Sequence, residues 1–108
     1  MCNFKQWSHS KYGYVIQCED CKSFQVCFGT TMLTLREEEY IQFTEWVVYK
    51  TESLVPLHDK NLKCISLPTV CPQVQVLLTE KELGHLHELV QEADNEMKVK
   101  QLLSLFHD

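Results

Sequence analysis

Two cysteines with two residues between them, Cys18 and Cys21, lie between segments that alternate like β-strands. A tight turn between strands lets thiols with this spacing bind one metal ion, and structural zinc sites take four such ligands in a tetrahedron. Cys2 and His9 precede the pair and offer two more soft ligands. We therefore expect a structural zinc site with Cys2, His9, Cys18 and Cys21 as ligands.

Other cysteines are alternatives for the remaining positions. Cys27 can replace Cys2, and Cys64 with Cys71 can supply a second pair, although their spacing of seven is wide for one turn. Otherwise we expect these three cysteines to be small buried apolar residues. Thiolates also bind iron, so the ligand set alone does not choose between the two metals.

The turn departs from common metal-binding turns. It contains Glu19 and Asp20, and Lys22 stands where zinc knuckles often have a glycine that lets backbone N–H groups approach the sulfur. A thioredoxin-like redox pair needs a helix N-terminus to lower the thiol pKa. Because this pair lies between predicted strands, we rank redox chemistry below metal binding.

Size and charge limit the remaining classes. A chain of 108 residues suits one domain, and 44% apolar and 23% charged residues are ordinary globular values. The start shows no secretory signal, so we expect a cytoplasmic protein whose cysteines are thiols or ligands rather than disulfides. The net charge is −5 with a single arginine, Arg36, which argues against nucleic-acid binding. No apolar run approaches the ~20 residues of a membrane span.

Local patterns predict the elements. Residues 1–12 lack a clean periodicity and are expected to form a loop. Apolar parity flips at Gly29, which predicts a long strand made of two pieces with a corner there. Capping boxes at Thr34–Glu37 and Thr79–Glu82 predict two helix starts. The expected strands are 14–19, 23–35, 62–67 and 73–78; the expected helices are 36–50 and 79–107, the second with a possible break near Asp94-Asn95.

These elements predict an α+β fold in ββαββα order. Consecutive strands with short links favour an antiparallel sheet of about four strands covered by helices. The expected single domain, 1–108, comprises a metal-binding loop and hairpin at 1–35, a helix at 36–50, a second strand pair at 61–78 and a C-terminal helix at 79–107.

The first half of the chain resembles a family of short, uncharacterised bacterial proteins. The matching motifs are Gly13-Tyr14-Val15-Ile16-Gln17-Cys18-Glu19-Asp20-Cys21 and Phe24-Gln25-Val26-Cys27-Phe28-Gly29-Thr30, followed by the acidic helix start Glu37-Glu38-Glu39. The hairpin is also similar to zinc ribbons, with Cys18 and Cys21 as the knuckle cysteines. Neither resemblance implies a substrate.

We expect a cytoplasmic, zinc-stabilised domain that binds a partner protein or another copy of itself. The alternative is a small zinc enzyme whose fourth metal position holds water, with Glu19 or Asp20 as general base. Stacking of single-stranded nucleic acid on Trp7 and Tyr12 ranks lower, and a redox role for the cysteine pair is the remaining alternative. A nucleophile elbow, a phosphate-binding glycine loop and a metalloprotease motif are all missing from the sequence.

Overall fold

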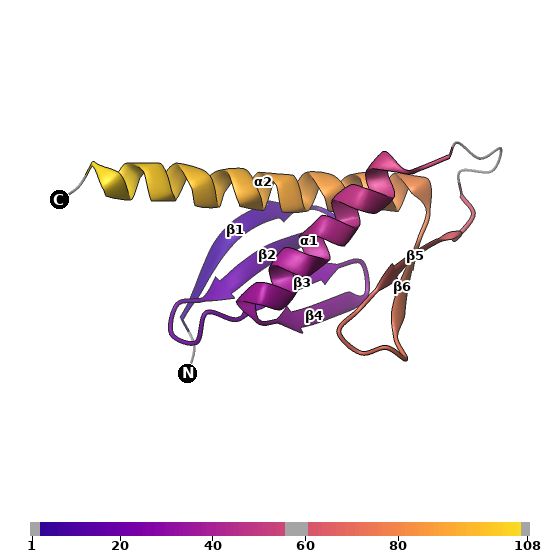
Figure 1. The fold of residues 1–108 in the computed structure, drawn as a ribbon, viewed down its shortest axis with the longest axis horizontal. Helices are drawn as coiled ribbons and strands as arrows, with labels where there is room; N and C mark the ends of the chain where they lie inside the picture. The colour runs from indigo at the N-terminus through magenta and orange to yellow at the C-terminus, as the bar shows by residue number, and fades with distance from the viewer. Residues whose placement is uncertain (1–2, 56–60, 107–108) are drawn as a thin grey trace.

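The fold is α+β, with the helices gathered on one side of an antiparallel sheet (Figure 1). The computed structural model describes residues 3–55 and 61–106. Its elements are β1 (Phe4–Ser10), β2 (Gly13–Cys18), β3 (Phe24–Phe28), β4 (Thr31–Leu35), α1 (Glu37–Glu52), β5 (Ile65–Pro68), β6 (Gln75–Leu78) and α2 (Glu80–Leu105). Four strands precede α1, so the expected ββαββα order is wrong.

The unexpected first strand is β1, which occupies most of the segment predicted as a loop. It pairs antiparallel with β2, and the register shifts between Gln6 and Ser8, which leaves Trp7 as the extra residue of a β-bulge. A bulge interrupts the alternation of inward and outward side chains. The sequence pattern therefore shows no period of two, although the backbone is extended.

Gly29 marks the division of the second predicted strand into β3 and β4. Its φ of +58° favours glycine, and the chain reverses there, so that Phe28 pairs with Thr31. The prediction of two pieces with a corner at Gly29 is confirmed, but the pieces fold back as a hairpin. The first four strands thus form one sheet in the order β1-β2-β3-β4.

The two helix starts differ in how well the sequence located them. At α2 the capping box is present, since the Glu82 N–H donates to Thr79 Oγ1 at 3.1 Å and the Thr79 N–H donates to Glu82 Oε1 at 2.9 Å. The box expected at Thr34–Glu37 is wrong. Strand β4 runs through the buried Leu35, and Arg36 becomes the N-cap, with its N–H donating to Glu39 Oε1 at 2.8 Å.

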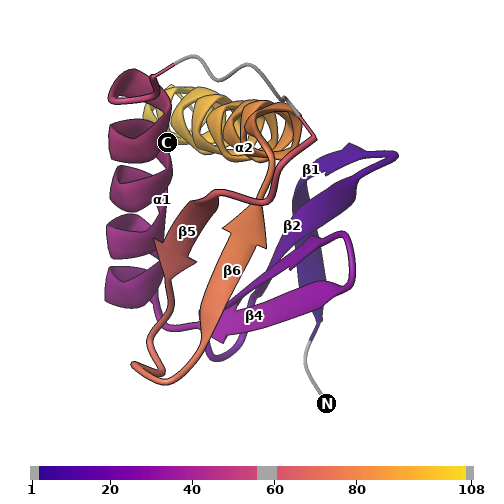
Figure 2. The same cartoon turned by 90° about the vertical axis from the view of Figure 1, so that its right-hand side faces the viewer.

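Both helices pack on the same side of the four-stranded sheet, and the β5–β6 hairpin lies at one end of it (Figures 1 and 2). Side chains from all of these layers meet in one hydrophobic core. Its members include Val15, Val26, Leu35, Phe43, Val47, Leu67, Leu78, Leu83, Leu86, Val90 and Ala93.

Helix α2 is a single unbroken helix, so the break expected near Asp94-Asn95 is not found. It extends well past the sheet and past α1 (Figure 1), and the molecule measures 54 × 27 × 24 Å. Within the described ranges, neither helix combines the length and apolar character needed to cross a membrane.

Candidate functional site

The cysteine pair occupies the turn that joins β2 to β3. The Cys21 N–H donates to Cys18 Sγ at 3.4 Å, and the Lys22 N–H donates to the Cys18 carbonyl oxygen at 2.9 Å. Lys22 has a φ of +68°, the left-handed conformation that glycine adopts most easily. The turn thus aims a backbone N–H group at the first sulfur without the glycine.

The two sulfur-bearing residues differ in exposure. Cys18 is 1% exposed and belongs to the packed end of β2, whereas Cys21 is exposed. A substitution at Cys21 therefore probes metal binding with less damage to the core than one at Cys18.

The start of the chain is tied to this turn. The Glu19 N–H donates to the Asn3 carbonyl oxygen at 2.7 Å, and the Asn3 N–H donates to Asp20 Oδ2 at 3.5 Å. Cys2 lies outside the described residues. Its sequence neighbour Asn3 is nevertheless held directly against the two residues between the cysteines.

His9 is not brought to the cysteine turn. It pairs with Tyr14, whereas Cys18 pairs with Phe4 at the other end of the same two strands. At about 3.3 Å per residue, this places the His9 backbone roughly 15 Å from that of Cys18. The described part of the chain holds no group of three or more His, Cys, Asp or Glu side chains that could bind a metal ion, and the four-ligand set stays a prediction.

The alternative cysteine ligands also lie apart from the turn in the strand register. Cys27 pairs with Tyr14 across β2 and β3, in the same row as His9. A hydrogen bond to Cys27 raises the pKa of Tyr14. Cys64 and Cys71 are exposed beside the β5–β6 hairpin. Sequence spacing alone gave no sign of the His9–Tyr14–Cys27 row, because it depends on the bulge-shifted register of β1.

Positive side chains gather next to the acidic turn. Lys5, Lys22 and Lys100 share a cavity of about 450 Å³ with Trp7, and the Nζ atoms of Lys5 and Lys100 lie 5.1 and 5.7 Å from the indole centroid. The neighbouring Lys5 lowers the pKa of Lys100. Glu19 and Asp20 line the same cavity, so the charges largely offset one another there.

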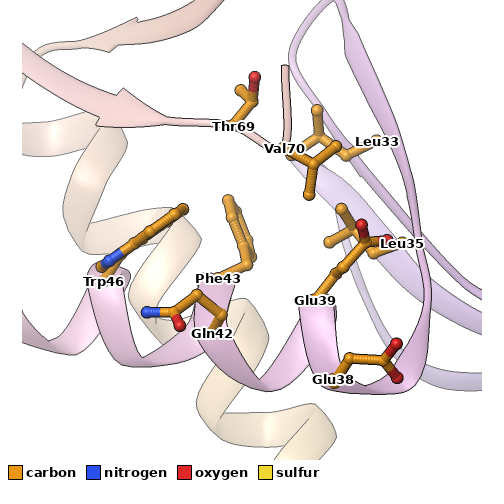
Figure 3. A pocket seen from close by; sticks show the side chains of 9 residues that line it. All are labelled: Leu33, Leu35, Glu38, Glu39, Gln42, Phe43, Trp46, Thr69 and Val70. Carbon is orange, nitrogen blue, oxygen red and sulfur yellow. The ribbon is translucent and has the colours of Figure 1, made fainter. Parts of the chain in front are cut away.

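An apolar groove of about 290 Å³ lies between β4, α1 and the loop after β5 (Figure 3). Leu35 and Phe43 are almost fully buried at its base, and Leu33 and Trp46 are half-buried. Val70 projects over the opening and is 52% exposed. The groove therefore has room and an apolar floor for a side chain from outside.

Carboxylates form one side of this groove. Glu38 and Glu39 stand at the start of α1, where Arg36 Nη1 lies 3.2 Å from a Glu38 carboxylate oxygen and Arg36 Nη2 lies 3.4 Å from one of Glu39. The backbone and side chain of Arg36 lower the pKa of Glu39. The two carboxylates give the groove a negative edge. The composition gave no hint of this groove, because it needs the β5–β6 loop to lie opposite α1.

The aromatic residues considered for nucleic-acid stacking are already engaged. Tyr12 stacks on His85 with centroids 3.6 Å apart, and Trp7 donates its Nε1–H to Gln17 at 3.0 Å while the two lysines lie over its ring. These contacts leave little aromatic face for bases.

The chain belongs to a family of unknown function, DUF6686, whose model matches residues 1–107. No curated protein and no solved structure matches the chain.

Proposed function

We propose that this protein is a cytoplasmic, zinc-stabilised module that binds a protein segment in the groove between β4, α1 and Val70. The observation that carries the proposal is the groove itself, an open apolar pocket of about 290 Å³ with a carboxylate edge. The cysteine turn is the proposed metal site. It lies on a different part of the sheet and would stabilise the hairpin from which the sheet is built.

The groove suits an extended segment that carries an apolar side chain followed by a basic one. Among the described strands, β4 is at the edge of its sheet, so its outer backbone groups can pair with an added strand. An apolar side chain of that strand would enter the space between Phe43 and Val70. A lysine or arginine next to it would meet Glu38, whose side chain is well exposed.

Chemical-shift mapping tests the groove with two short synthetic peptides, one Val-Thr-Leu-Lys-Lys and one Val-Thr-Leu-Glu-Glu. We expect the basic peptide alone to shift the signals of Leu33, Phe43 and Val70. Val70→Glu should abolish the shifts. Val74→Glu is the matched control, since Val74 is 51% exposed and lies outside the groove lining, and should leave them intact. Equal responses to both peptides, or none to either, would contradict the proposal.

The metal part of the proposal rests on the turn geometry and on the tie between Asn3 and the turn. Native mass spectrometry with elemental analysis should find one zinc per chain. Cys21→Ser should lose it, whereas Cys64→Ser, which also replaces an exposed cysteine, should keep it. A folded, reduced protein that carries no zinc after expression in zinc-supplemented medium would sink the metal site and favour a dithiol redox role.

Chelation gives a second readout, because structural zinc can contribute on the order of 10 kcal/mol to folding. We expect removal of the metal to lower the melting temperature. A chelated sample with an unchanged melting temperature would show that the metal, if bound, is not structural.

A zinc enzyme is the second candidate, favoured by the position of His9 at the far end of the hairpin. If Cys2, Cys18 and Cys21 are the protein ligands, water is free to take the fourth position, with Glu19 or Asp20 beside it as base. X-ray absorption of the zinc protein separates the two cases. Three sulfur atoms and one oxygen support the enzyme, and a sphere closed by sulfur or imidazole excludes inner-sphere catalysis.

A further inference from the structure

The outer end of α2 carries an apolar stripe that faces away from the core. The stripe consists of Val99, Leu102, Leu103 and Phe106, which recur at spacings of three, four and seven. These side chains are between 48% and 82% exposed. Large apolar side chains gathered on an exposed helix face mark an interaction surface.

The direction of the stripe follows from the continuity of the helix. Leu102 follows the buried Leu86 by sixteen residues, and Phe106 follows the buried Val90 by sixteen. At 100° per residue, each pair is offset by about 160° around an unbroken helix. The hydrophobic pattern thus changes sides along α2, and its last part faces away from the sheet that the first part covers.

We propose that this stripe pairs antiparallel with the same stripe of a second copy of the chain. Two-fold symmetry about a point between Leu102 and Leu103 would set Val99 of one copy against Phe106 of the other. Residues 101–106 carry no charged side chain, so two copies of the stripe meet without repulsion.

Charge complementarity favours the antiparallel direction. The last turn of α2 has no basic residue, which leaves the negative end of the helix dipole without a partner on its own helix. In an antiparallel pair, Lys98 of each copy, whose Nζ lies 3.0 Å from Asp94 Oδ2 on its own helix, comes near the last turn of the other copy. At 100° per residue, three acidic residues of α2 lie on the stripe side: Glu88, Glu92 and Glu96. In a parallel pair, each of them would face the same residue of the other copy and repel it.

The contact is small and the expected dimer is correspondingly weak. About nine residues per copy bury much less than the ~800 Å² per partner of a standard interface. A dissociation constant on the order of 10–100 µM is expected, which makes the dimer concentration-dependent.

Sedimentation velocity over about 5–500 µM, with zinc present, tests the proposal. We expect the wild type to shift from monomer to dimer and Leu103→Glu to remain monomeric with unchanged zinc content and helix content. Leu77→Glu is the matched control, because Leu77 on β6 is 56% exposed and Leu103 is 54% exposed, and it should dimerise like the wild type.

The proposal would be overturned by a wild type that is monomeric throughout, by a Leu103→Glu variant that still dimerises, or by a stripe that binds anionic vesicles while the protein stays monomeric. Isotope-filtered NOEs in a mixed sample determine the direction of pairing. Contacts between Val99 methyls and the Phe106 ring of another copy support the antiparallel pair, and Val99–Val99 contacts overturn it. Zinc content and groove binding are measured separately, so their failure is distinguishable from failure of the dimer.

Discussion

Lys22 shows how a single backbone angle determines the form of the cysteine turn. Its φ of +68° lies where a side chain is strained, yet this conformation lets its N–H reach the Cys18 carbonyl oxygen while the Cys21 N–H points at the sulfur. The chain accepts this strain at one exposed position and gains a fixed turn.

Lys22→Gly should stabilise the metal-free protein by about 1 kcal/mol, because glycine adopts a positive φ without the Cβ penalty. Lys22→Ala keeps a Cβ at the same φ and should bring no such gain. Urea unfolding of both variants in chelator checks this. Equal gains in the two variants would show that removal of the lysine charge, and not the backbone, is responsible.

Tyr40 makes stability sensitive to high pH. Burial, and then the negative charge of Asp94, raise the pKa of Tyr40 above the ordinary tyrosine value, and its hydroxyl has no hydrogen-bond partner among the described residues. Because the folded state holds the proton more tightly, the contribution is complete below pH ~10 and is lost as the pH rises further.

Tyr40→Phe should therefore weaken the loss of stability between about pH 10 and 12, and at pH 7 it should be neutral or stabilising by up to about 1 kcal/mol. Tyr49→Phe, at an exposed tyrosine, is the control and should follow the wild type. Urea unfolding across this range is the measurement. Parallel pH profiles for the wild type and Tyr40→Phe would contradict the assignment.

At the scale of elements, the sequence located those whose pattern is regular. Strand β2, helix α1 and the start of α2 agree with the predictions to within a few residues, because each has uninterrupted periodicity or a side-chain cap. Strand β1 was missed since the bulge at Trp7 removes the alternation on which strand prediction depends. The phase change near Asp94-Asn95 was read as a break, whereas it marks a change of the face that is apolar.

Two glycines in these elements should respond in opposite ways to alanine. A Cβ on Gly13 would overlap the Cys27 carbonyl oxygen, whereas a Cβ on Gly84 in α2 would meet no heavy atom within 4 Å. Gly84→Ala should stabilise by about 0.5–1 kcal/mol through helix propensity, and Gly13→Ala should destabilise by roughly 2 kcal/mol or more. Thermal unfolding measures both, and a stabilising Gly13→Ala would show that the β2–β3 approach is looser than described.

For the whole molecule, the position of the candidate site depended on contacts that spacing does not encode. The sequence placed Cys18 and Cys21 on a turn between strands, which the structure confirms. It also grouped His9 with them, but His9 pairs with Tyr14 and therefore lies at the other end of the β1–β2 hairpin from Cys18. The groove requires Thr69 and Val70 of the β5–β6 loop to lie opposite α1, a long-range contact that no local sequence pattern predicts.

The overhanging end of α2 should be separable from the fold. The Cα radius of gyration is 14.9 Å, whereas about 13 Å is typical of a compact chain of this length. Truncation after Met97 also removes Leu103 and should leave a monomer. Its radius of gyration in X-ray scattering should be lower by about 1–2 Å. The truncation should cost less than about 1 kcal/mol of stability, because the last fully buried residue of α2 is Ala93. Loss of folding on truncation would show that the helix end supports the core.

The strands of the first sheet lie in the same order as in the sequence, which affects how the chain folds. Each of β1 to β4 pairs with the strand next to it in sequence, so short loop closures suffice and this part can form rapidly. During synthesis the meander emerges before both helices, and α1 can cover only part of its apolar face, which includes Val15 and Val26, until α2 leaves the ribosome. The interval between these two events is when the nascent protein is most open to aggregation.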